Sequence, residues 1–261
     1  MAHLHADVHG QGRTAVLLHG QPGGRHDWDG VVEHLGGRVR AVVPDRLGYG
    51  ATGGRADGFA ANADAVAGLL DEVGAADAVV VGHSWAGGVA LAFAQRHPGR
   101  VAALVLVGAV GGPGSVSFVD RALAAPFFGD ALALGGLTVI GARPVRRLVA
   151  PVAADARAGE GWWRRWRSFM TEQRAMLREL PGIAEHLPDV RAPGIVVFGD
   201  GDRIVRPASQ QALAVAIRAE VVGVAGAGHL VPRERPDAVA DAVLRATRLA
   251  PPGPAGAIIG A

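Results

Sequence analysis

The sequence predicts an α/β protein built on a mostly parallel, doubly wound sheet. Short runs recur along the chain that are apolar at consecutive positions, as expected for strands covered by helices on both faces. Amphipathic helical patterns lie between these runs, and this alternation indicates a parallel sheet with right-handed crossovers. The chain has 261 residues, of which 49% are hydrophobic, so it can bury one sizeable core.

The expected strands and helices alternate along most of the chain. The apolar runs that are expected to form strands cover residues 14–20, 38–45, 77–84, 100–110, 192–200 and 219–229. Helical patterns lie near residues 27–36, 58–73, 86–97, 207–218 and 235–249.

The alternation breaks in one long segment, residues 112–190. This segment holds no strong strand pattern, and the apolar residues between Trp162 and Leu180 have helical spacing. We interpret it as a helical cap inserted into a core formed by residues 1–111 and 191–249. Residues 250–261 are rich in Pro and Gly, and we expect them to form a flexible tail.

The composition excludes several classes of protein. The absence of Cys excludes disulfides, thiolate metal sites and a Cys nucleophile. The basic residues are scattered and the formal net charge is only +2, so no nucleic-acid partner is expected. The ten His residues form no pair with metal-ligand spacing and carboxylate support, so we expect no metal and no cofactor. The chain lacks a signal-peptide pattern and an apolar run of membrane-spanning length, so we expect a soluble, cytoplasmic protein without a membrane partner.

The stretch VVVGHSWAGG places a single Ser at a sharp turn between an expected strand and an expected helix. This pattern is typical of a nucleophile elbow, in which the turn exposes the Ser side chain at the carboxyl end of the sheet. Strand and helix pass close together there, so small residues are needed two positions before and after the Ser. Gly82 meets this requirement, and Ala86 meets it with one extra methyl group. The alternative is an ordinary turn in which Ser84 caps the helix.

A Ser nucleophile needs a base, and the base needs an acid that orients it. Asp202 follows the run 192–200, and His229 ends the run 219–229. The order Ser84, Asp202, His229 is the order that such a sheet requires, with each residue at the carboxyl end of a strand. Asp200 is an alternative for the acid.

The stretch LLHGQPGG follows the first strong strand and can direct backbone N–H groups toward the Ser. An oxyanion hole needs two such donors, and we assign them to the N–H groups of Gln21 and Trp85. The alternative is that the Gly and Pro residues form only a turn.

At this point the chain resembles the α/β-hydrolase superfamily over nearly its whole length. The stretches that carry the resemblance are HGQPGG, DRLGYG, GHSWAG, GDGDRIV and GAGHLVPRERP. The resemblance implies the α/β-hydrolase fold, with the cap inserted after the sixth strand of the family fold. It implies that Ser84 is the nucleophile, His229 the general base and acid, and Asp202 the acid that orients His229. It also implies that Asp45 belongs to a structural turn.

Two His residues beside these motifs are expected to have structural roles. On the elbow, His83 should point away from the Ser84 hydroxyl and pack or form a hydrogen bond. His19 should brace the oxyanion loop.

The type of nucleophile narrows the expected chemistry. Relatives that open epoxides or displace halide use Asp, because a Ser would give an ether that water cannot cleave. Acyl chemistry remains, and we expect a capped serine hydrolase that cleaves an uncharged, largely apolar ester or lactone through an acyl-enzyme. The expected partner is a small apolar substrate, with the pocket lined by Phe128, Trp163, Trp166 and Leu230.

Further activities of this fold stay open. HGxPGG and a Trp after the Ser are similar to proline iminopeptidases, but Gln21 stands where these have Gly, and the expected cap has no acidic cluster for an amine. The same fold is also compatible with thioester, amide or C–C bond cleavage, with cofactor-free haloperoxidase or perhydrolase activity, and with a ligand-binding or cyclase role.

Overall fold

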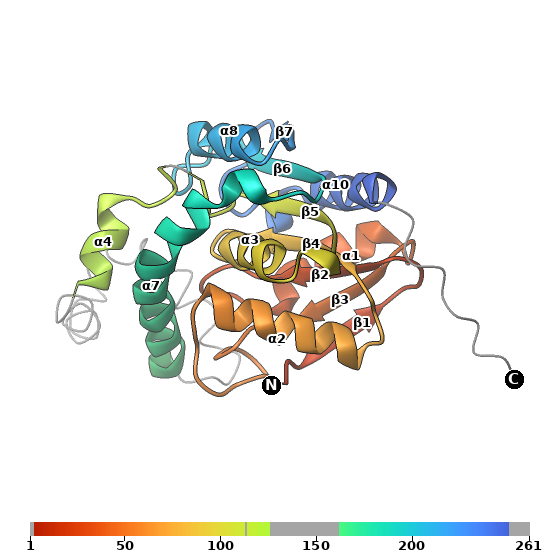
Figure 1. Cartoon of the computed structure of the whole chain (residues 1–261), viewed down its shortest axis with the longest axis horizontal. Coiled ribbons are helices and arrows are strands. Elements are labelled where there is room, and N and C mark those ends of the chain that lie inside the picture. Colours follow the sequence, from red (N-terminus) through yellow and green to blue (C-terminus); the bar gives the residue numbers. More distant parts are fainter. Residues whose placement is uncertain (1–2, 113, 126–161, 251–261) are drawn as a thin grey trace, which may run out of the picture.

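A seven-stranded sheet forms the centre of the molecule, which is a computed structural model that describes residues 3–112, 114–125 and 162–250 (Figure 1). The strand order is β1-β3-β2-β4-β5-β6-β7, and only β1 is antiparallel to its neighbour. The strands are β1 Ala6–His9, β2 Thr14–Leu18, β3 Arg40–Pro44, β4 Ala78–His83, β5 Val101–Val107, β6 Gly194–Gly199 and β7 Glu220–Val224. The predicted fold class is therefore confirmed, and each of the six expected runs contains a strand.

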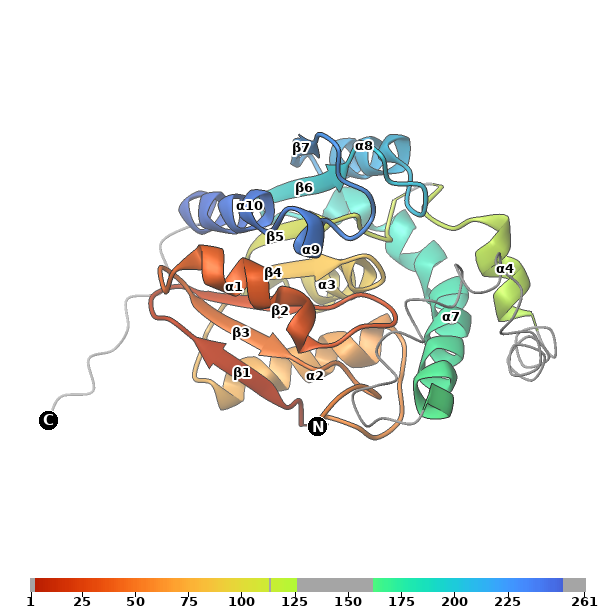
Figure 2. The ribbon, with the colours of Figure 1, turned by 180° about the vertical axis from the view of Figure 1, so that it is seen from behind.

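The helices lie on both faces of the sheet (Figures 1 and 2). Those expected from the sequence are α1 Asp29–Leu35, α2 Phe59–Glu72, α3 Ala86–Arg96, α8 Pro207–Ala216 and α10 Pro236–Leu249. The structure adds α9 Val231–Glu234 and the short 3₁₀ helices Arg25–Trp28, Pro98–Arg100 and Leu187–Asp189. Two further helices, α4 Phe118–Ala124 and α7 Trp162–Glu185, lie between β5 and β6.

The core has two halves because successive side chains of a strand point to opposite faces. Val16, Leu18 and Val80 pack with residues of α2, α3 and α8 on one face. Ala15 and Leu17 pack with residues of α1 and α10 on the other. Both faces are therefore covered, which explains why the central strands are apolar at consecutive positions.

Two strands at the edges of the sheet differ from the expectation. β1 was not expected, because its four residues include exposed positions and contain no apolar run. The expectation that the run 219–229 is buried on both faces is wrong. Glu220 and Val221 are exposed, since β7 is the last strand of the sheet, and the strand ends at Val224.

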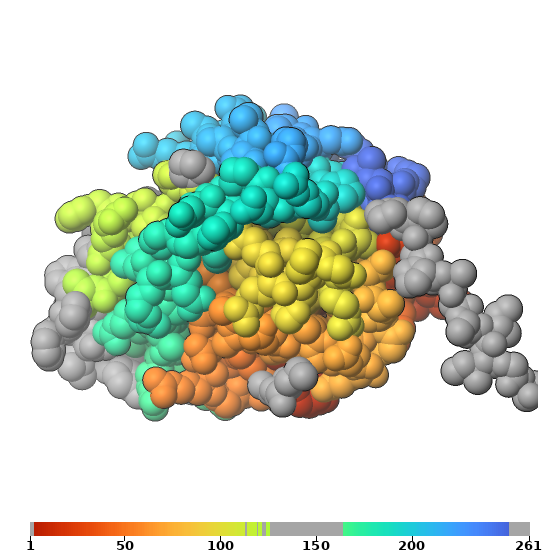
Figure 3. Space-filling model, viewed as in Figure 1, coloured from red at the N-terminus to blue at the C-terminus, as the bar shows by residue number. Residues whose placement is uncertain are grey.

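The described part of the segment between β5 and β6 is helical. Within residues 114–125 and 162–190 the structure has no strand, and α7 packs against α2 and α3 (Figure 3). The assignment of residues 112–190 as a separate cap stays a prediction. The predicted tail lies, from residue 251 onward, outside the described residues. Across the described residues, no helix is long and apolar enough to cross a membrane.

Candidate active site

Ser84 lies on a strained turn between β4 and α3. Its φ of +53° is in the left-handed region, which is uncommon for a residue other than glycine. The turn requires Gly at position 82, because a Cβ there would lie 2.4 Å from the carbonyl oxygen of Ala86. The strand and the helix thus pass at backbone contact, and the Ser84 side chain is placed at the carboxyl end of the sheet.

The first turn of α3 is also tightly packed. A Cβ at Gly87 would lie 2.4 Å from the Ala109 Cβ, and one at Gly88 would lie 2.5 Å from the Phe59 ring. Ala86 is fully buried and its methyl group is accommodated. The closest contacts therefore lie at Gly82, Gly87 and Gly88. Position 86 is less restricted, which explains why it can hold Ala where the motif usually has Gly.

Three side chains from different strand ends form a continuous hydrogen-bonded chain. Ser84 Oγ lies 2.8 Å from His229 Nε2, and His229 Nδ1 lies 2.8 Å from Asp202 Oδ2. The Asp202 side chain is 0% exposed and that of His229 is 10% exposed. With the carboxylate as an acceptor, Nδ1 carries the proton and Nε2 can accept the proton of the Ser84 hydroxyl. This arrangement can transfer a proton from the hydroxyl to the imidazole.

The two candidate acids have different partners. Asp202 Oδ1 accepts the N–H groups of Ile204 and Val205 at 2.8 and 3.0 Å, which leaves Oδ2 directed at His229. Asp200 is exposed, and its Oδ1 accepts the N–H of Gly226 at 2.9 Å. The structure thus brings Asp202 into contact with His229.

The backbone around His229 is held from two sides. His83 Nε2 lies 3.0 Å from the carbonyl oxygen of His229. The Glu234 carboxylate accepts the N–H groups of Gly228 and Leu230. His83 was expected to pack or to form a hydrogen bond, whereas the role of Glu234, within the stretch GAGHLVPRERP, was not predicted from the sequence.

His83 should make the protein less stable in acid. Burial, and then the charge of His229, lowers the pKa of His83 to about 3. The unfolded chain binds this proton near pH 6.5, so the free energy of unfolding should fall as pH decreases below 6.5, by about 2 kcal/mol between pH 7 and pH 5 from this group. The free energy of unfolding, measured with urea at pH 7 and at pH 5, should decrease less in His83→Asn than in the wild type, by about 2 kcal/mol. The exposed His34→Asn serves as the control, and equal pH dependence in wild type and His83→Asn would contradict the assignment.

The loop after β2 lies directly against Ser84. A Cβ at Gly20 would lie 3.1 Å from the Ser84 Cβ, so this loop approaches the serine at backbone distance. Within the described part of the chain, no backbone hydrogen bond is donated by the N–H of Gln21 or Trp85. The role of these two N–H groups as donors to an oxyanion stays a prediction.

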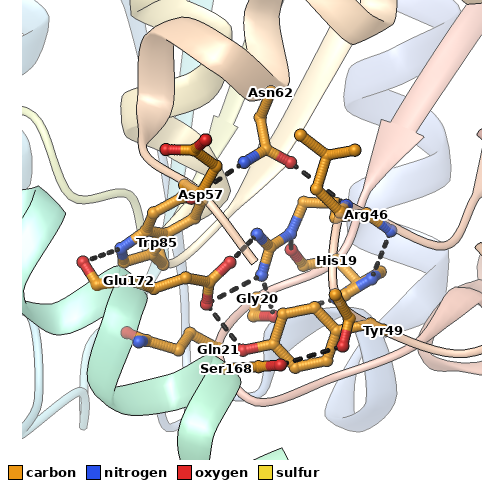
Figure 4. Close-up of polar contacts among 12 residues, drawn as sticks. His19, Gly20, Gln21, Arg46, Tyr49, Asp57, Asn62, Trp85, Ser168 and Glu172 are labelled. Atoms are coloured by element: carbon orange, nitrogen blue, oxygen red, sulfur yellow. Dashed lines mark hydrogen bonds and ion pairs between the residues drawn. The ribbon is translucent and has the colours of Figure 1, made fainter. Parts of the chain in front are cut away.

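A buried charged cluster beside this loop was missed from the sequence. Arg46 is 1% exposed and pairs with Glu172 of α7, which is 0% exposed and also accepts a hydrogen bond from the Tyr49 hydroxyl (Figure 4). The sequence does indicate that Glu172 is buried, because this residue falls three positions after Phe169 and four before Met176, on the apolar face of the helix.

Asp45 and His19 form hydrogen bonds that are consistent with structural roles. Asp45 accepts the N–H groups of Arg25 and Ala51 and pairs with the Arg25 side chain, so it holds the turn. His19 Nδ1 lies 2.9 Å from the carbonyl oxygen of Gly20, within its own loop.

The predicted pocket residues are only partly described. Phe128 and the Trp163 side chain lie outside what the structure describes. Trp166 is buried on α7 and stacks on Phe169, with ring centroids 5.6 Å apart. Leu230 follows His229 and is 41% exposed. Their contact with a substrate stays a prediction.

Among the described residues, no group of three or more His, Asp and Glu side chains could hold a metal ion.

Comparisons with known proteins agree with this architecture. A family model described as the alpha/beta hydrolase family matches residues 15–242. A thermophilic esterase from Thermogutta terrifontis superposes with a TM-score of 0.73, is 27% identical, and the match covers 94% of this chain and 93% of that one.

Two curated relatives match over shorter stretches. A 2-hydroxymuconate semialdehyde hydrolase from Pseudomonas putida is 40% identical over 107 residues, which is 39% of this chain and 38% of the relative. An uncharacterized protein from Mycobacterium tuberculosis is 36% identical over 135 residues, which is 51% of this chain and 40% of the relative. The matched stretches thus span about two fifths of each curated relative.

Proposed function

The chain belongs to the alpha/beta hydrolase family and is a hydrolase, and on this premise we propose that it cleaves an uncharged, largely apolar ester or lactone with Ser84 as nucleophile. The observation that carries the proposal is the hydrogen-bonded chain from Ser84 through His229 to Asp202. A strained turn holds the first of these residues, and hydrogen bonds to the backbone hold the other two in place.

The proposed reaction begins with attack of Ser84 Oγ on the acyl carbon while His229 Nε2 takes the hydroxyl proton. Negative charge then develops on the carbonyl oxygen, where the N–H groups of Gln21 and Trp85 can donate hydrogen bonds. His229 returns the proton to the leaving alkoxide, which departs as the alcohol of an ester or stays on the acyl chain as the hydroxyl group of an opened lactone, and an acyl-enzyme remains on Ser84. His229 next deprotonates a water that attacks the acyl carbon, and it then reprotonates Ser84 Oγ as the acid is released.

Asp202 supports both half-reactions without changing its own protonation. Its carboxylate keeps the His229 proton on Nδ1 and stabilises the imidazolium that forms in each transition state. Because the Asp202 side chain is fully buried, its charge acts on His229 with little screening by water.

The side chains of α7 support an uncharged substrate. Trp166, Phe169 and Met170 form an apolar cluster on the part of this helix next to the Gln21 loop, where Gln21 Nε2 donates to the carbonyl oxygen of Phe169. Glu172 is occupied by Arg46 and Tyr49, so it is not poised to hold a substrate amine. This occupancy favours an ester over the prolyl substrate of an iminopeptidase.

A series of p-nitrophenyl esters should define the substrate class. From acetyl to octanoyl, kcat/KM should rise as each buried CH₂ contributes up to about 0.8 kcal/mol, and then level off when the pocket is full. Lactones and prolyl p-nitroanilide complete the comparison. If prolyl anilide is the best substrate by tenfold or more, the peptidase activity replaces the proposal.

Covalent labelling separates catalysis from a binding or cyclase role. A fluorophosphonate probe should modify Ser84, detected as a mass increase on the peptide that contains it. Absence of labelling in the folded protein would reject the serine hydrolase.

The similarity to the Pseudomonas putida relative favours one second candidate, hydrolysis of 2-hydroxymuconate semialdehyde. The same nucleophile and oxyanion donors could serve this reaction. Incubation with 2-hydroxymuconate semialdehyde, followed by analysis of the products, tests it against the ester series.

A further inference from the structure

Arg46 binds the backbone of the loop that carries Gln21. Its Nε donates to the carbonyl oxygen of His19 at 2.8 Å, and its Nη2 donates to that of Gly20 at 2.9 Å. The two carbonyl groups are consecutive, so the planar guanidinium holds this backbone at two adjacent points (Figure 4).

The hydrogen bond to Gly20 fixes the direction of the Gln21 N–H. The peptide bond between Gly20 and Gln21 is trans, and in a trans peptide the C=O and N–H groups point in opposite directions. Since the Gly20 oxygen points toward Arg46, the Gln21 N–H points away from Arg46. The same residue, Gly20, lies against the Ser84 Cβ, so the peptide that carries this N–H is next to the nucleophile.

His19 strengthens the same restraint. Its Nε2 accepts the backbone N–H of Arg46 at 3.0 Å, so its proton is on Nδ1, which donates to the Gly20 oxygen at 2.9 Å. Burial, and then the charge of Arg46, holds the pKa of His19 well below its ordinary value, which keeps the ring neutral. The Gly20 oxygen thus accepts two hydrogen bonds.

The counter-charge for Arg46 comes from α7. Glu172 pairs with the Arg46 guanidinium and accepts the Tyr49 hydroxyl at 2.6 Å. Its backbone oxygen accepts Trp85 Nε1 at 3.3 Å, and the Arg46 guanidinium lies 4.5 Å from the centre of the Trp85 ring. The cluster therefore contacts Trp85, and it contacts the Gly20 carbonyl group of the peptide that carries the Gln21 N–H.

We infer that Arg46 and Glu172 are positioning residues for the reaction, and this inference rests on the proposed serine hydrolase function. Arg46 orients the Gln21 N–H through the Gly20 carbonyl group, and Glu172 keeps the buried Arg46 charge in place. Two further hydrogen bonds attach the stretch of α7 next to Glu172 to neighbouring loops, since Ser168 Oγ donates to the Gly48 carbonyl oxygen and the Phe169 carbonyl oxygen accepts Gln21 Nε2. A buried ion pair often contributes little to the free energy of unfolding. We therefore explain the Arg46–Glu172 pair by the orientation of the loop that Arg46 holds.

The test compares kcat per active site in variants of the full chain. Arg46→Lys keeps the charge but lacks the planar fork, and it should reduce kcat for p-nitrophenyl butyrate at least tenfold, with KM changed less than about threefold. The endpoint of fluorophosphonate labelling counts the competent sites, and the rate is divided by this number. A loss of folded protein therefore does not lower the kcat that is compared. Arg13→Met is the matched control, since Arg13 pairs with Asp77 at the amino ends of the strands.

A double variant separates positioning from packing. Arg46→Met with Glu172→Met replaces the buried pair by apolar side chains, which often leaves stability unchanged. The folded double variant should keep its melting temperature near that of the wild type and still lose at least tenfold in kcat per labelled site.

The outcomes have distinct meanings. A fall of less than tenfold in kcat per labelled site in both Arg46→Lys and the double variant overturns the inference. In that case, normal labelling of the wild type leaves the proposed function intact. Failure of the wild type to label at Ser84 rejects the proposed function itself.

Discussion

Replacing Ser84 with Ala is expected to lower kcat for p-nitrophenyl esters by about six orders of magnitude, the loss typical of removing a serine nucleophile. The reason is that Ser84 Oγ forms the covalent bond to the acyl group, and no other hydroxyl is hydrogen-bonded to His229 among the described residues. Measurement of kcat in Ser84→Ala, together with loss of fluorophosphonate labelling, checks this result.

The variant should fold normally. Ala and Ser have similar costs at the positive φ of this turn, and removal of one hydroxyl leaves the apolar packing of α3 unchanged. Ser117→Ala at the start of α4 is a suitable control, since among the described residues the hydroxyl of this exposed residue is hydrogen-bonded to Asp120 alone. Ester hydrolysis by Ser84→Ala within tenfold of the wild-type rate would contradict the proposed mechanism.

The parts of the fold that the sequence predicts are those set by local patterns. Buried parallel strands are apolar at consecutive positions, and the elbow needs Gly at position 82 for a steric reason that involves only nearby residues. The expected order of Ser84, Asp202 and His229 also follows from the chain order of the strands. These features need no knowledge of contacts between distant segments.

The features that the sequence did not predict depend on distant contacts. Arg46 and Glu172 are 126 positions apart, and nothing in either local stretch identifies the other as its partner. β1 is defined by its pairing with β3 and not by its own composition. Glu234 could be seen to follow His229 in the sequence, but its role depends on the short turn that brings it back to Gly228 and Leu230.

The cluster at Arg46 also bears on how specificity could arise. Gln21 Nε2 reaches α7 at the Phe169 carbonyl group, while the backbone of Gln21 belongs to the loop beside Ser84. One residue thus links the proposed oxyanion hole to the apolar wall formed by Trp166 and Phe169. Because of this link, we expect changes in the packing of Trp166 and Phe169 to alter the position of the Gln21 loop.

Replacing Asp202 with Asn is expected to lower kcat by about four orders of magnitude while leaving the backbone in place. Asp202 Oδ1 accepts the N–H groups of Ile204 and Val205, so the carbonyl oxygen of Asn must occupy that position. The amide NH₂ group then faces His229 Nδ1, which must become an acceptor. The His229 proton moves to Nε2, where it prevents the ring from accepting the proton of Ser84 Oγ.

The matched control for this prediction is Asp200→Asn, two positions away on the same loop. Asp200 Oδ1 accepts the Gly226 N–H, and the Asn oxygen can accept it equally well. We therefore expect kcat of Asp200→Asn to stay within about threefold of the wild type, because a neutral amide oxygen replaces an exposed carboxylate oxygen as the acceptor. Steady-state kinetics on the two purified variants distinguishes the acids directly. A larger loss in Asp200→Asn than in Asp202→Asn would show that the charge at position 200 controls His229, despite the 2.8 Å contact with Asp202.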